Sequence, residues 1–566
     1  MVSLSPSSSA ADDQQTARDT SDHTLPKRPW RLYRTPWDRI VSHRYPGEGT
    51  DDKPYIVDWL PEGADGQGDP ENPMTWRDPY KWTVVMSVAL ATLAVAMASS
   101  TLSGATQSIA MTFSSYPTPV YVMVTSAFVL GFVVGPLLWA PASEVLGRRK
   151  MFIFSYILFT AFNGGVVASQ NIWTLIVLRF FAGTAGSSPL TNAGGTVSDV
   201  LDASERGLGM ALFAAAPFLG PALGPIVGGF LGETGGWRWV AALIAIFTAL
   251  LTAFGFLIIP ETYAPVLLRA RAQRLSQATG RVYRSKFEKD KEIRLSELFK
   301  TALGRPWVLL FREPIVFLLS LYLAIVYATL YMLFGAFPIV FQETRGWSPG
   351  VGGLAFLGVL VGFMIALLYI IFYENPRYAR KLQQEKGWLP PEQRLPPAII
   401  GGGLFSFAWT AAPASLPWIA PIICSAPFGC GMVLVFLSCF NYLIDSYLLY
   451  AASVLAANSV LRSLFGVGFP LFVTPMYHNL GVNWASTLVA FLALACAPLP
   501  LYADLAQEVC ANGQRLLRVG AKDPAHVPVC QACGRRRADD AKDGTGKGRP
   551  WSVDLCISPV SVSVTI

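Results

Sequence analysis

The stretch Gly131–Lys150 reads GFVVGPLLWAPASEVLGRRK, which starts as an apolar run and ends in one acidic residue and a basic cluster. Long apolar segments lie on both sides of it. Because cationic residues are retained on the cytoplasmic side of membranes, a Gly-Arg-Arg-Lys turn between two apolar spans predicts a very short cytoplasmic loop. Gly147 permits a sharp turn, and Glu144 lies within local reach of Arg148 and Arg149. Taken alone, such a loop is only a topology signal.

The composition is typical of a membrane protein. Of the 566 residues, 52% are hydrophobic and only 14% are charged, whereas about 25% of residues are charged in soluble domains. Apolar runs of about 20 residues fit the core of a bilayer, which disfavours a soluble enzyme. The net charge of +7 is explained by cytoplasmic loops and predicts no nucleic-acid partner. The eight cysteines are scattered, and the lone pair Cys530 and Cys533 is too weak a signal to predict a metal site or a cofactor.

Twelve apolar segments predict an all-α membrane protein with two six-helix halves. The predicted spans are 82–103, 120–140, 151–169, 172–196, 207–232, 238–259, 314–340, 350–372, 397–412, 418–442, 450–474 and 483–502. The corresponding domains are a disordered cytoplasmic tail (1–80), the first half (81–260), a cytoplasmic central loop (261–313), the second half (314–502) and an atypical cytoplasmic tail (503–566). We interpret this last tail, whose composition is mixed, as a translated intron or a shifted reading frame.

The distribution of basic residues predicts the orientation. The short loops 141–150, 197–206 and 373–396 carry nine Lys and Arg residues, whereas the loops on the other side carry only Arg238 and Arg345. This asymmetry places both termini in the cytoplasm. The basic run 269–274 in the central loop can enforce that topology or bind anionic lipid, and we favour topology.

The loop around Gly147 resembles the signature loop between spans 2 and 3 of the major facilitator superfamily, usually written G-x-L-a-D-r-x-G-r-r. Glu144 takes the acidic place, whereas Ala140 and Val145 depart from the pattern. The glutamate and the preceding Gly-Pro-Leu (135–137) are most similar to the twelve-span fungal drug:proton antiporters. The stretch DPENPMTW (69–76) also resembles the segment before span 1 in that group. The resemblance covers residues 70–502.

A second motif lies in predicted span 5. Small residues at these spacings permit close helix contact, and a proline removes a backbone donor and bends the helix. Ordinary small-residue packing is the alternative interpretation. The spacing matches the antiporter motif of the superfamily, which implies export and a bend at the interface of the halves. The motif residues are Gly220, Gly224, Pro225, Gly228 and Gly229.

Charged residues near or inside the spans are candidates for gating and coupling. Arg179 is costly inside an apolar span, and it resembles the span-4 arginine linked to proton coupling; a structural arginine capped by carbonyls is the alternative. We expect Asp199, with Glu205 and Arg206, to form an ion-pair cluster with the Gly147 loop that breaks in one transport state. Asp445 is a candidate partner for Arg462, and anchoring of the helix end is the alternative role for Asp445. The full set is Glu144, Arg148, Arg149, Arg179, Asp199, Arg206, Asp445 and Arg462.

No Asp, Glu or His lies at the middle of any predicted span, so the sequence assigns no proton site. The resemblance implies that spans 1, 4, 7 and 10 line the cavity. Packing or lipid contact is the alternative interpretation for each aromatic residue. The candidate cavity residues are Ser100, Ser103, Asn192, Tyr327, Tyr331 and Asn441, with Ser99, Tyr322 and Phe334 beside them.

Together these features predict a monomeric transporter, not an enzyme, that exports lipophilic or amphipathic small molecules by proton antiport. Its expected partners are the small-molecule substrate, protons and the lipid bilayer, with no nucleic acid. The expected location is the plasma membrane, with the vacuolar membrane as the alternative. A proton-coupled importer or uniporter of a small polar nutrient, and a substrate-sensing receptor on the same fold, are the alternative functions.

Overall fold

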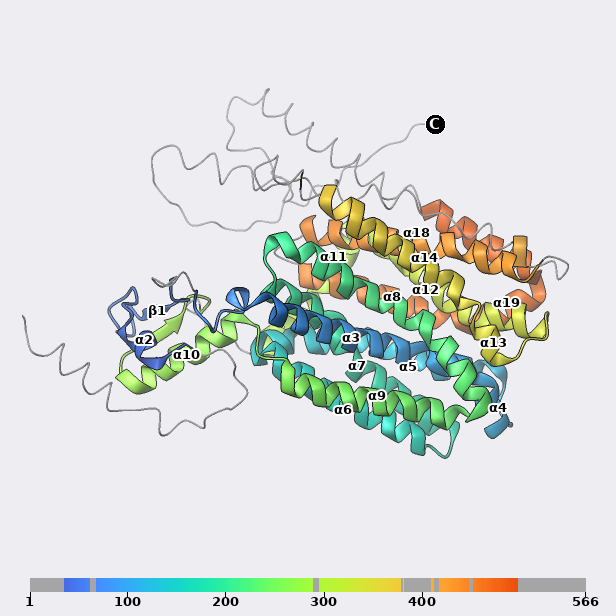
Figure 1. The fold of residues 1–566 in the computed structure, drawn as a ribbon, viewed down its shortest axis with the longest axis horizontal. Coiled ribbons are helices and arrows are strands. Elements are labelled where there is room, and N and C mark those ends of the chain that lie inside the picture. The colour runs from blue at the N-terminus through green and yellow to red at the C-terminus, as the bar shows by residue number, and fades with distance from the viewer. Residues whose placement is uncertain are drawn as a thin grey trace, which may run out of the picture.

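The computed structural model describes residues 35–61, 68–288, 295–377, 380, 409–411, 417–446 and 451–496. Long helices run side by side along one axis, and a small separate unit lies beyond one end of the bundle (Figure 1). Within the described ranges, nine helices are long and apolar enough to cross a membrane. The fold is therefore all-helical within the bundle, as the apolar segments predict.

The first half contains the helices expected from the first six apolar segments. They are α3 (Asp78–Gly104), α5 (Thr118–Leu146), α6 (Arg148–Ala168), α7 (Ile172–Val200), α8 (Ala203–Thr234) and α9 (Trp237–Ile258), with a short α4 (Thr106–Thr112) after α3. Helix α7 is too polar to count among the nine apolar helices, because it carries Arg179 and several Ser, Thr and Asn residues. It packs against α3, α5 and α6. Its buried polar residues are Arg179, Ser187, Ser188, Asn192 and Thr196.

The second half begins with α12 (Pro314–Phe337), which continues as a π-helical turn, η2 (Pro338–Glu343). The next elements are α13 (Pro349–Gly353), α14 (Phe356–Tyr369) with its π-helical end η3 (Ile370–Glu374), α18 (Ile419–Ser446) and α19 (Ala451–Cys496). In α19, Gly481 has φ 76° and ψ 160°, which breaks the helix between predicted spans 11 and 12. Apart from 409–411, predicted span 9 lies outside the described residues, as does the whole tail 503–566.

The tail and the central loop form a folded unit, which differs from the disordered tail expected over 1–80. Residues 35–61 pack against the central loop, and Asp69 and Glu71 bond to Arg271 of that loop. This tail–loop unit contains α2 (Trp37–Ser42), β1 (Tyr55–Val57), η1 (Pro73–Thr75), α10 (Ala264–Thr279) and β2 (Tyr283–Ser285). Strands β1 and β2 pair in parallel, with Tyr55 opposite Tyr283. Helix α11 (Leu295–Arg312) then leads into α12.

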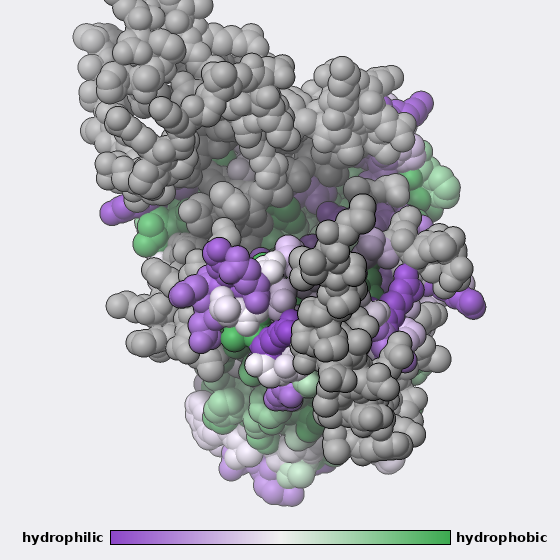
Figure 2. Space-filling view, turned by 90° about the vertical axis from the view of Figure 1, so that its left-hand side faces the viewer, coloured by the Kyte–Doolittle hydropathy of each residue, from purple (hydrophilic) through white to green (hydrophobic). Residues whose placement is uncertain are grey.

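A small apolar core holds the tail–loop unit together. Ile40, Val57 and Leu60 from the tail are buried against Leu268 and Leu275 of α10. The apolar residues of the tail, and those of α10, are each too few to predict a folded unit. A core forms only when the tail and α10 pack together. Seen from this end of the molecule, hydrophilic side chains gather on the described surface, and apolar ones lie along the sides of the bundle (Figure 2).

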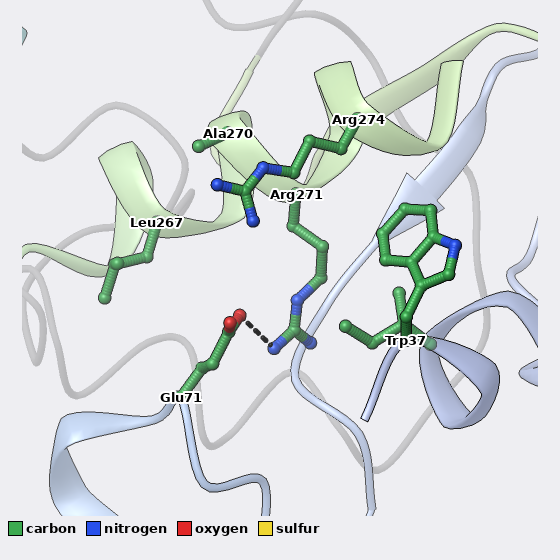
Figure 3. A pocket seen from close by; sticks show the side chains of 7 residues that line it. Trp37, Glu71, Leu267, Ala270, Arg271 and Arg274 are labelled. Atoms are coloured by element: carbon green, nitrogen blue, oxygen red, sulfur yellow. Dashed lines mark hydrogen bonds and ion pairs between the residues drawn. The ribbon is translucent and has the colours of Figure 1, made fainter. Parts of the chain in front are cut away.

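Arg271 is the central ion of the tail–loop unit. Its guanidinium donates to Asp69 Oδ2 at 2.6 Å and Oδ1 at 3.1 Å. It also donates to Glu71 Oε2 at 2.8 Å, the bond that Figure 3 shows. It also lies over the ring of Trp59, with its Cζ 5.3 Å from the ring centroid. A fork that binds both carboxylate oxygens is the strongest geometry for this pair. Arg271 of the basic run is thus bonded inside the protein.

Candidate substrate and coupling site

Arg179 is buried where three helices of the first half meet. Only 2% of its surface is exposed. Its Nε donates to the carbonyl of Val124 on α5 at 3.2 Å, and its Nη2 donates to the carbonyl of Ser99 on α3 at 3.1 Å. The guanidinium lies 4.2 Å from the ring centroid of Phe128. Arg179 therefore ties α7 to α3 and α5, as the carbonyl-capped interpretation requires.

The same part of α3 bonds to the second half. The hydroxyl of Ser99 donates to the carbonyl of Ala96 at 2.6 Å. Because a serine hydroxyl has a single proton, Tyr331 must be the donor in the 2.9 Å bond between Tyr331 Oη and Ser99 Oγ. Tyr327 then donates to Tyr331 at 3.2 Å. The bonds form one directed chain from α12 to α3.

The chain of contacts ends at a second buried arginine. Arg462 on α19 is 8% exposed, and its Cζ lies 4.7 Å from the ring centroid of Tyr327. We call Arg179, Ser99, Tyr331, Tyr327 and Arg462 the central network. It contains two arginines, one from each half, and no acidic residue. Sequence analysis identified each of these five residues as a candidate, but it did not predict that they lie in contact with one another.

The loop around Gly147 forms a second cluster, which we call the loop cluster. Arg148 Nε lies 3.5 Å from Asp199 Oδ2 at the end of α7, and Arg148 Nη1 donates to Ser143 Oγ at 2.8 Å. The two charged side chains of the ion pair are 14% and 20% exposed. Arg148 also lies 4.8 Å from the ring centroid of Tyr263. One pair of the expected ion cluster is therefore present in this conformation.

Other members of the expected cluster lie apart from this pair. Glu144 is exposed and makes no hydrogen bond or ion pair with any described residue. Arg206 donates to the carbonyls of Ser198 at 3.3 Å and Leu201 at 3.5 Å. Arg149 donates to the carbonyl of Phe256 at 2.9 Å. Both arginines therefore bond to the backbone at helix ends.

Glu261 belongs to the loop cluster, and our sequence analysis did not identify it. Its carboxylate accepts the backbone N–H groups of Arg148 at 2.9 Å and Arg149 at 3.3 Å, which are the first two of α6. An anion at a helix N-terminus binds free donors and interacts favourably with the helix dipole. Burial raises the pKa of Glu261, against the effect of these N–H groups. Gly147 is required here, because it has φ 98° and a Cβ atom would lie 2.2 Å from Glu261 Oε2.

The glycine motif of α8 packs against α3. A Cβ atom added at Gly220 would lie 2.5 Å from Ala96 Cβ, one at Gly224 would lie 2.0 Å from Ser100 Oγ, and one at Gly228 would lie 1.8 Å from the carbonyl oxygen of Thr101. The helices approach as closely as small residues permit. Every one of these glycines is therefore needed for the α3–α8 contact.

The remaining motif residues face the second half. A Cβ atom at Gly229 would lie 2.5 Å from the carbonyl oxygen of Pro349, and one at Gly353 would lie 2.7 Å from that of Pro225. Pro225 has no N–H to donate to the carbonyl of Pro221 four residues earlier. Ser100 donates to that carbonyl at 3.0 Å instead. Ser100, expected in the cavity, thus lies at the α3–α8 contact.

The other candidate cavity residues are placed as follows. Ser103 donates to the carbonyl of Ser100 at 2.7 Å. Asn192 is buried on α7 and donates to Ser188 Oγ at 3.1 Å. Asn441 is half-buried on α18, and the side chain of Asp445 lies outside what the structure describes. The described residues contain no group of three or more His, Cys, Asp or Glu side chains that could hold a metal ion.

Comparison with known proteins identifies the class. The model of the Major Facilitator Superfamily matches residues 85–470. The chain is 58% identical to the MFS-type efflux pump MFS2 of Trichophyton rubrum, over 81% of this chain and 77% of that protein. It is 54% identical to the multidrug transporter mdrA of Aspergillus fumigatus, over 82% of this chain and 76% of that protein. The fold also resembles the proton:xylose symporter XylE, with a TM-score of 0.54 and 15% identity over 75% of this chain and 95% of that one.

The chain therefore belongs to the major facilitator superfamily. It is a multi-pass membrane transporter and not an enzyme. The family and the fold class predicted from the Gly147 loop and the apolar segments are confirmed.

Proposed function

We propose that the chain exports lipophilic or amphipathic small molecules, such as drugs or secondary metabolites, by alternating access. The observation that carries this proposal is the glycine and proline face of α8, which packs on α3 with Gly228 and reaches the second half with Gly229. This is the segment whose spacing matches the antiporter motif. The efflux pump MFS2 and the multidrug transporter mdrA, both more than half identical to this chain, support the outward direction.

Contacts between the halves support alternating access. At the end opposite the Gly147 loop, Gln107 Nε2 donates to Gln342 Oε1 at 3.1 Å. At the same end, the backbone N–H of Gly350 donates to Glu233 Oε2 at 3.0 Å. These bonds close one end of the bundle in this conformation. Alternating access requires these bonds between the halves to break when that end opens, while contacts between the halves form at the other end.

We further propose that proton movement is coupled to export through the central network and the loop cluster. Arginine stays protonated at any physiological pH, so Arg179 acts through its neighbours. Its field bears on Tyr331, which bonds to Ser99 next to the guanidinium. Asp199, paired with Arg148, is the acidic group placed to gain or lose a proton when the halves move. We place the transporter in the plasma membrane as a monomer, with its termini in the cytoplasm.

Transport direction is tested by comparing cells that express the chain with cells that carry an empty vector. A panel of radiolabelled azoles and other amphipathic antifungals serves as the probe. We expect lower accumulation of at least one compound, and resistance to it, in expressing cells. Higher accumulation of a probe indicates an importer, and equal accumulation across the panel contradicts export of this class. An N-terminal epitope tag that labels from outside intact cells contradicts the proposed orientation.

A further inference from the structure

The second half contains a buried cation, Arg462, with no counter-ion among the described residues. Arg462 is 8% exposed, and its guanidinium lies between the rings of Tyr327 and Phe436, 4.7 Å and 5.1 Å from their centroids. Among the residues that the structure describes, Arg462 makes no hydrogen bond or ion pair, and its Nε is unpartnered. Burying a charge in this way is costly unless an anion or a polar ligand compensates it.

Unpaired polar groups lie beside Arg462 on the same helix. Asn458 is fully buried, and neither its amide nitrogen nor its amide oxygen has a partner among the described residues. It lies four residues before Arg462, which places the two side chains on one face of α19. The hydroxyl of Ser463 is also buried and unpartnered in this part of the chain. A guanidinium next to a carboxamide presents several donors, which suits a carboxylate.

Arg179 provides the contrast within the same network. Two of its donors are used by the carbonyls of Val124 and Ser99, so it has a structural task in the first half. Arg462 makes no such bond with any described residue. Asp445 was the expected partner, but it follows Phe436 by nine residues on α18, about 13 Å at the rise of an α-helix. The backbone therefore places Asp445 more than two turns from the ring that Arg462 covers.

We propose that Arg462 and Asn458 bind the carboxylate of the exported molecule, while Tyr327 and Phe436 pack against its apolar body. The substrate class is then an amphipathic organic acid, ideally an aromatic one. This inference rests on the proposed export function and names its substrate. An anion bound at Arg462 also contacts Tyr327, whose hydroxyl donates to Tyr331, and it is thereby linked to the bond between Tyr331 and Ser99.

The first test measures equilibrium binding to the purified full-length protein. The probes are radiolabelled 2-naphthoic acid and 2-naphthamide, which share a ring system and differ in charge. We expect the wild type to bind the acid about tenfold or more tightly than the amide, as for a charge-assisted bond. Arg462→Gln should abolish this preference, and Arg462→Lys should retain part of it. Equal binding of the acid and the amide by the wild type, or binding of neither, overturns the assignment.

Two further variants separate binding from folding. Asn458→Asp places a carboxylate one turn from Arg462, and this internal counter-ion should weaken acid binding without lowering the thermal unfolding temperature. Arg274→Gln is the matched control, because Arg274 lies in the tail–loop unit beside Trp37 (Figure 3) and its loss removes the same charge far from the site. It should keep the wild-type preference. Unchanged acid binding in Asn458→Asp, or equal loss in Arg274→Gln, overturns the assignment.

Transport measurements distinguish this inference from the export function itself. Inside-out membrane vesicles are offered 2-naphthoic acid, 2-naphthamide and a neutral azole. Export of the azole with no preference for the acid contradicts the carboxylate site and leaves export standing. Export of no probe contradicts both. Acetate and chloride, added as competitors, should displace 2-naphthoic acid only weakly; full displacement at matched concentration indicates a small-anion site and overturns the substrate assignment.

Discussion

The hydroxyl oxygens of Ser99 and Tyr331 lie 2.9 Å apart and join the two halves of the transporter at its centre. Ser99 is also the residue whose carbonyl accepts from Arg179. A single residue of α3 thus contacts the buried cation of the first half through its backbone and the aromatic network of the second half through its side chain. A movement of one half relative to the other has to stretch or break this bond.

Tyr331→Phe tests that connection, because it removes one hydroxyl and keeps the ring. Loss of a buried hydrogen bond costs about 1 kcal/mol, which shifts an equilibrium between two states about fivefold. We expect the efflux rate to change severalfold while the amount of protein in the membrane stays the same. Tyr322→Phe is the matched control, since Tyr322 lies on the same helix, is buried and makes no hydrogen bond with the described residues. Equal effects of the two variants contradict a special role for Tyr331.

Arg179 should tolerate lysine better than alanine. Lysine keeps the charge but loses the planar fork that reaches the carbonyls of Val124 and Ser99 together. We expect Arg179→Lys to retain part of the efflux activity and Arg179→Ala to lose it, with both proteins present in the membrane. Efflux against imposed pH gradients in vesicles provides the measurement. An Arg179→Ala protein that responds to the gradient as the wild type does shows that the residue is only structural.

The pair of Arg148 and Asp199 should behave as one unit. Its side chains are mostly buried, so a coupling energy of about 1 kcal/mol is expected. Arg148→Gln and Asp199→Asn should each lower efflux, and the double variant should be no worse than the stronger single one. Glu144→Gln is the comparison, because Glu144 is exposed and outside this pair. Fully additive losses in the double variant contradict coupling between the two residues.

Gly228 should not accept even a methyl group. A Cβ atom there would lie 1.8 Å from the carbonyl oxygen of Thr101, so α3 and α8 must move apart. Overpacking of this kind costs about 1–3 kcal/mol or more. We expect Gly228→Ala to lower the thermal unfolding temperature and the yield of protein in the membrane. Gly164→Ala is the control, since nothing lies within 4 Å of a Cβ atom at Gly164; a similar loss in both variants shows that helix packing is not the cause.

The tail–loop unit should depend on pH through Asp69. Burial favours the protonated acid, but the hydrogen bonds from Arg271 hold the pKa of Asp69 below its usual range. A lowered folded-state pKa means that Asp69 stabilises the unit above its unfolded pKa of about 3.9 and loses this effect as the pH falls. We expect faster proteolysis of the tail in Asp69→Asn at pH 7, and in the wild type only at acidic pH. Wild-type resistance in Asp69→Asn contradicts this role.

The sequence predicts the family and most helices because their signals are local. A glycine between an apolar run and two arginines is enough to place the turn at Gly147. In contrast, Glu261 caps a helix that starts 113 residues earlier, and Arg271 meets Asp69 across 202 residues. The periodicity of apolar residues does not predict contacts between residues so far apart in the sequence. The polar tail therefore looked unstructured, since its few apolar residues acquire a core only from α10.

In the candidate site, too, local features could be predicted from the sequence and contacts between distant residues could not. Arg179 and Arg462 could be identified because a cation inside an apolar segment is unusual. Their partners could not be identified, because they lie on other helices of the same half and only tertiary packing brings those helices together. Arg179 meets Val124 and Ser99 in the first half, and Arg462 meets Tyr327 and Phe436 in the second. Ser100 was predicted to line the cavity because it is polar. Its hydroxyl donates to the carbonyl of Pro221, which lacks its helical hydrogen bond because Pro225 has no N–H.

Transport into vesicles with a defined lumenal pH tests whether export is driven by protons. A radiolabelled compound that expressing cells export is offered to inside-out vesicles with an acidic or a pH-matched lumen. We expect severalfold accumulation in the acidic lumen, which a protonophore abolishes. Accumulation that is the same with and without the gradient contradicts proton antiport and indicates a uniporter.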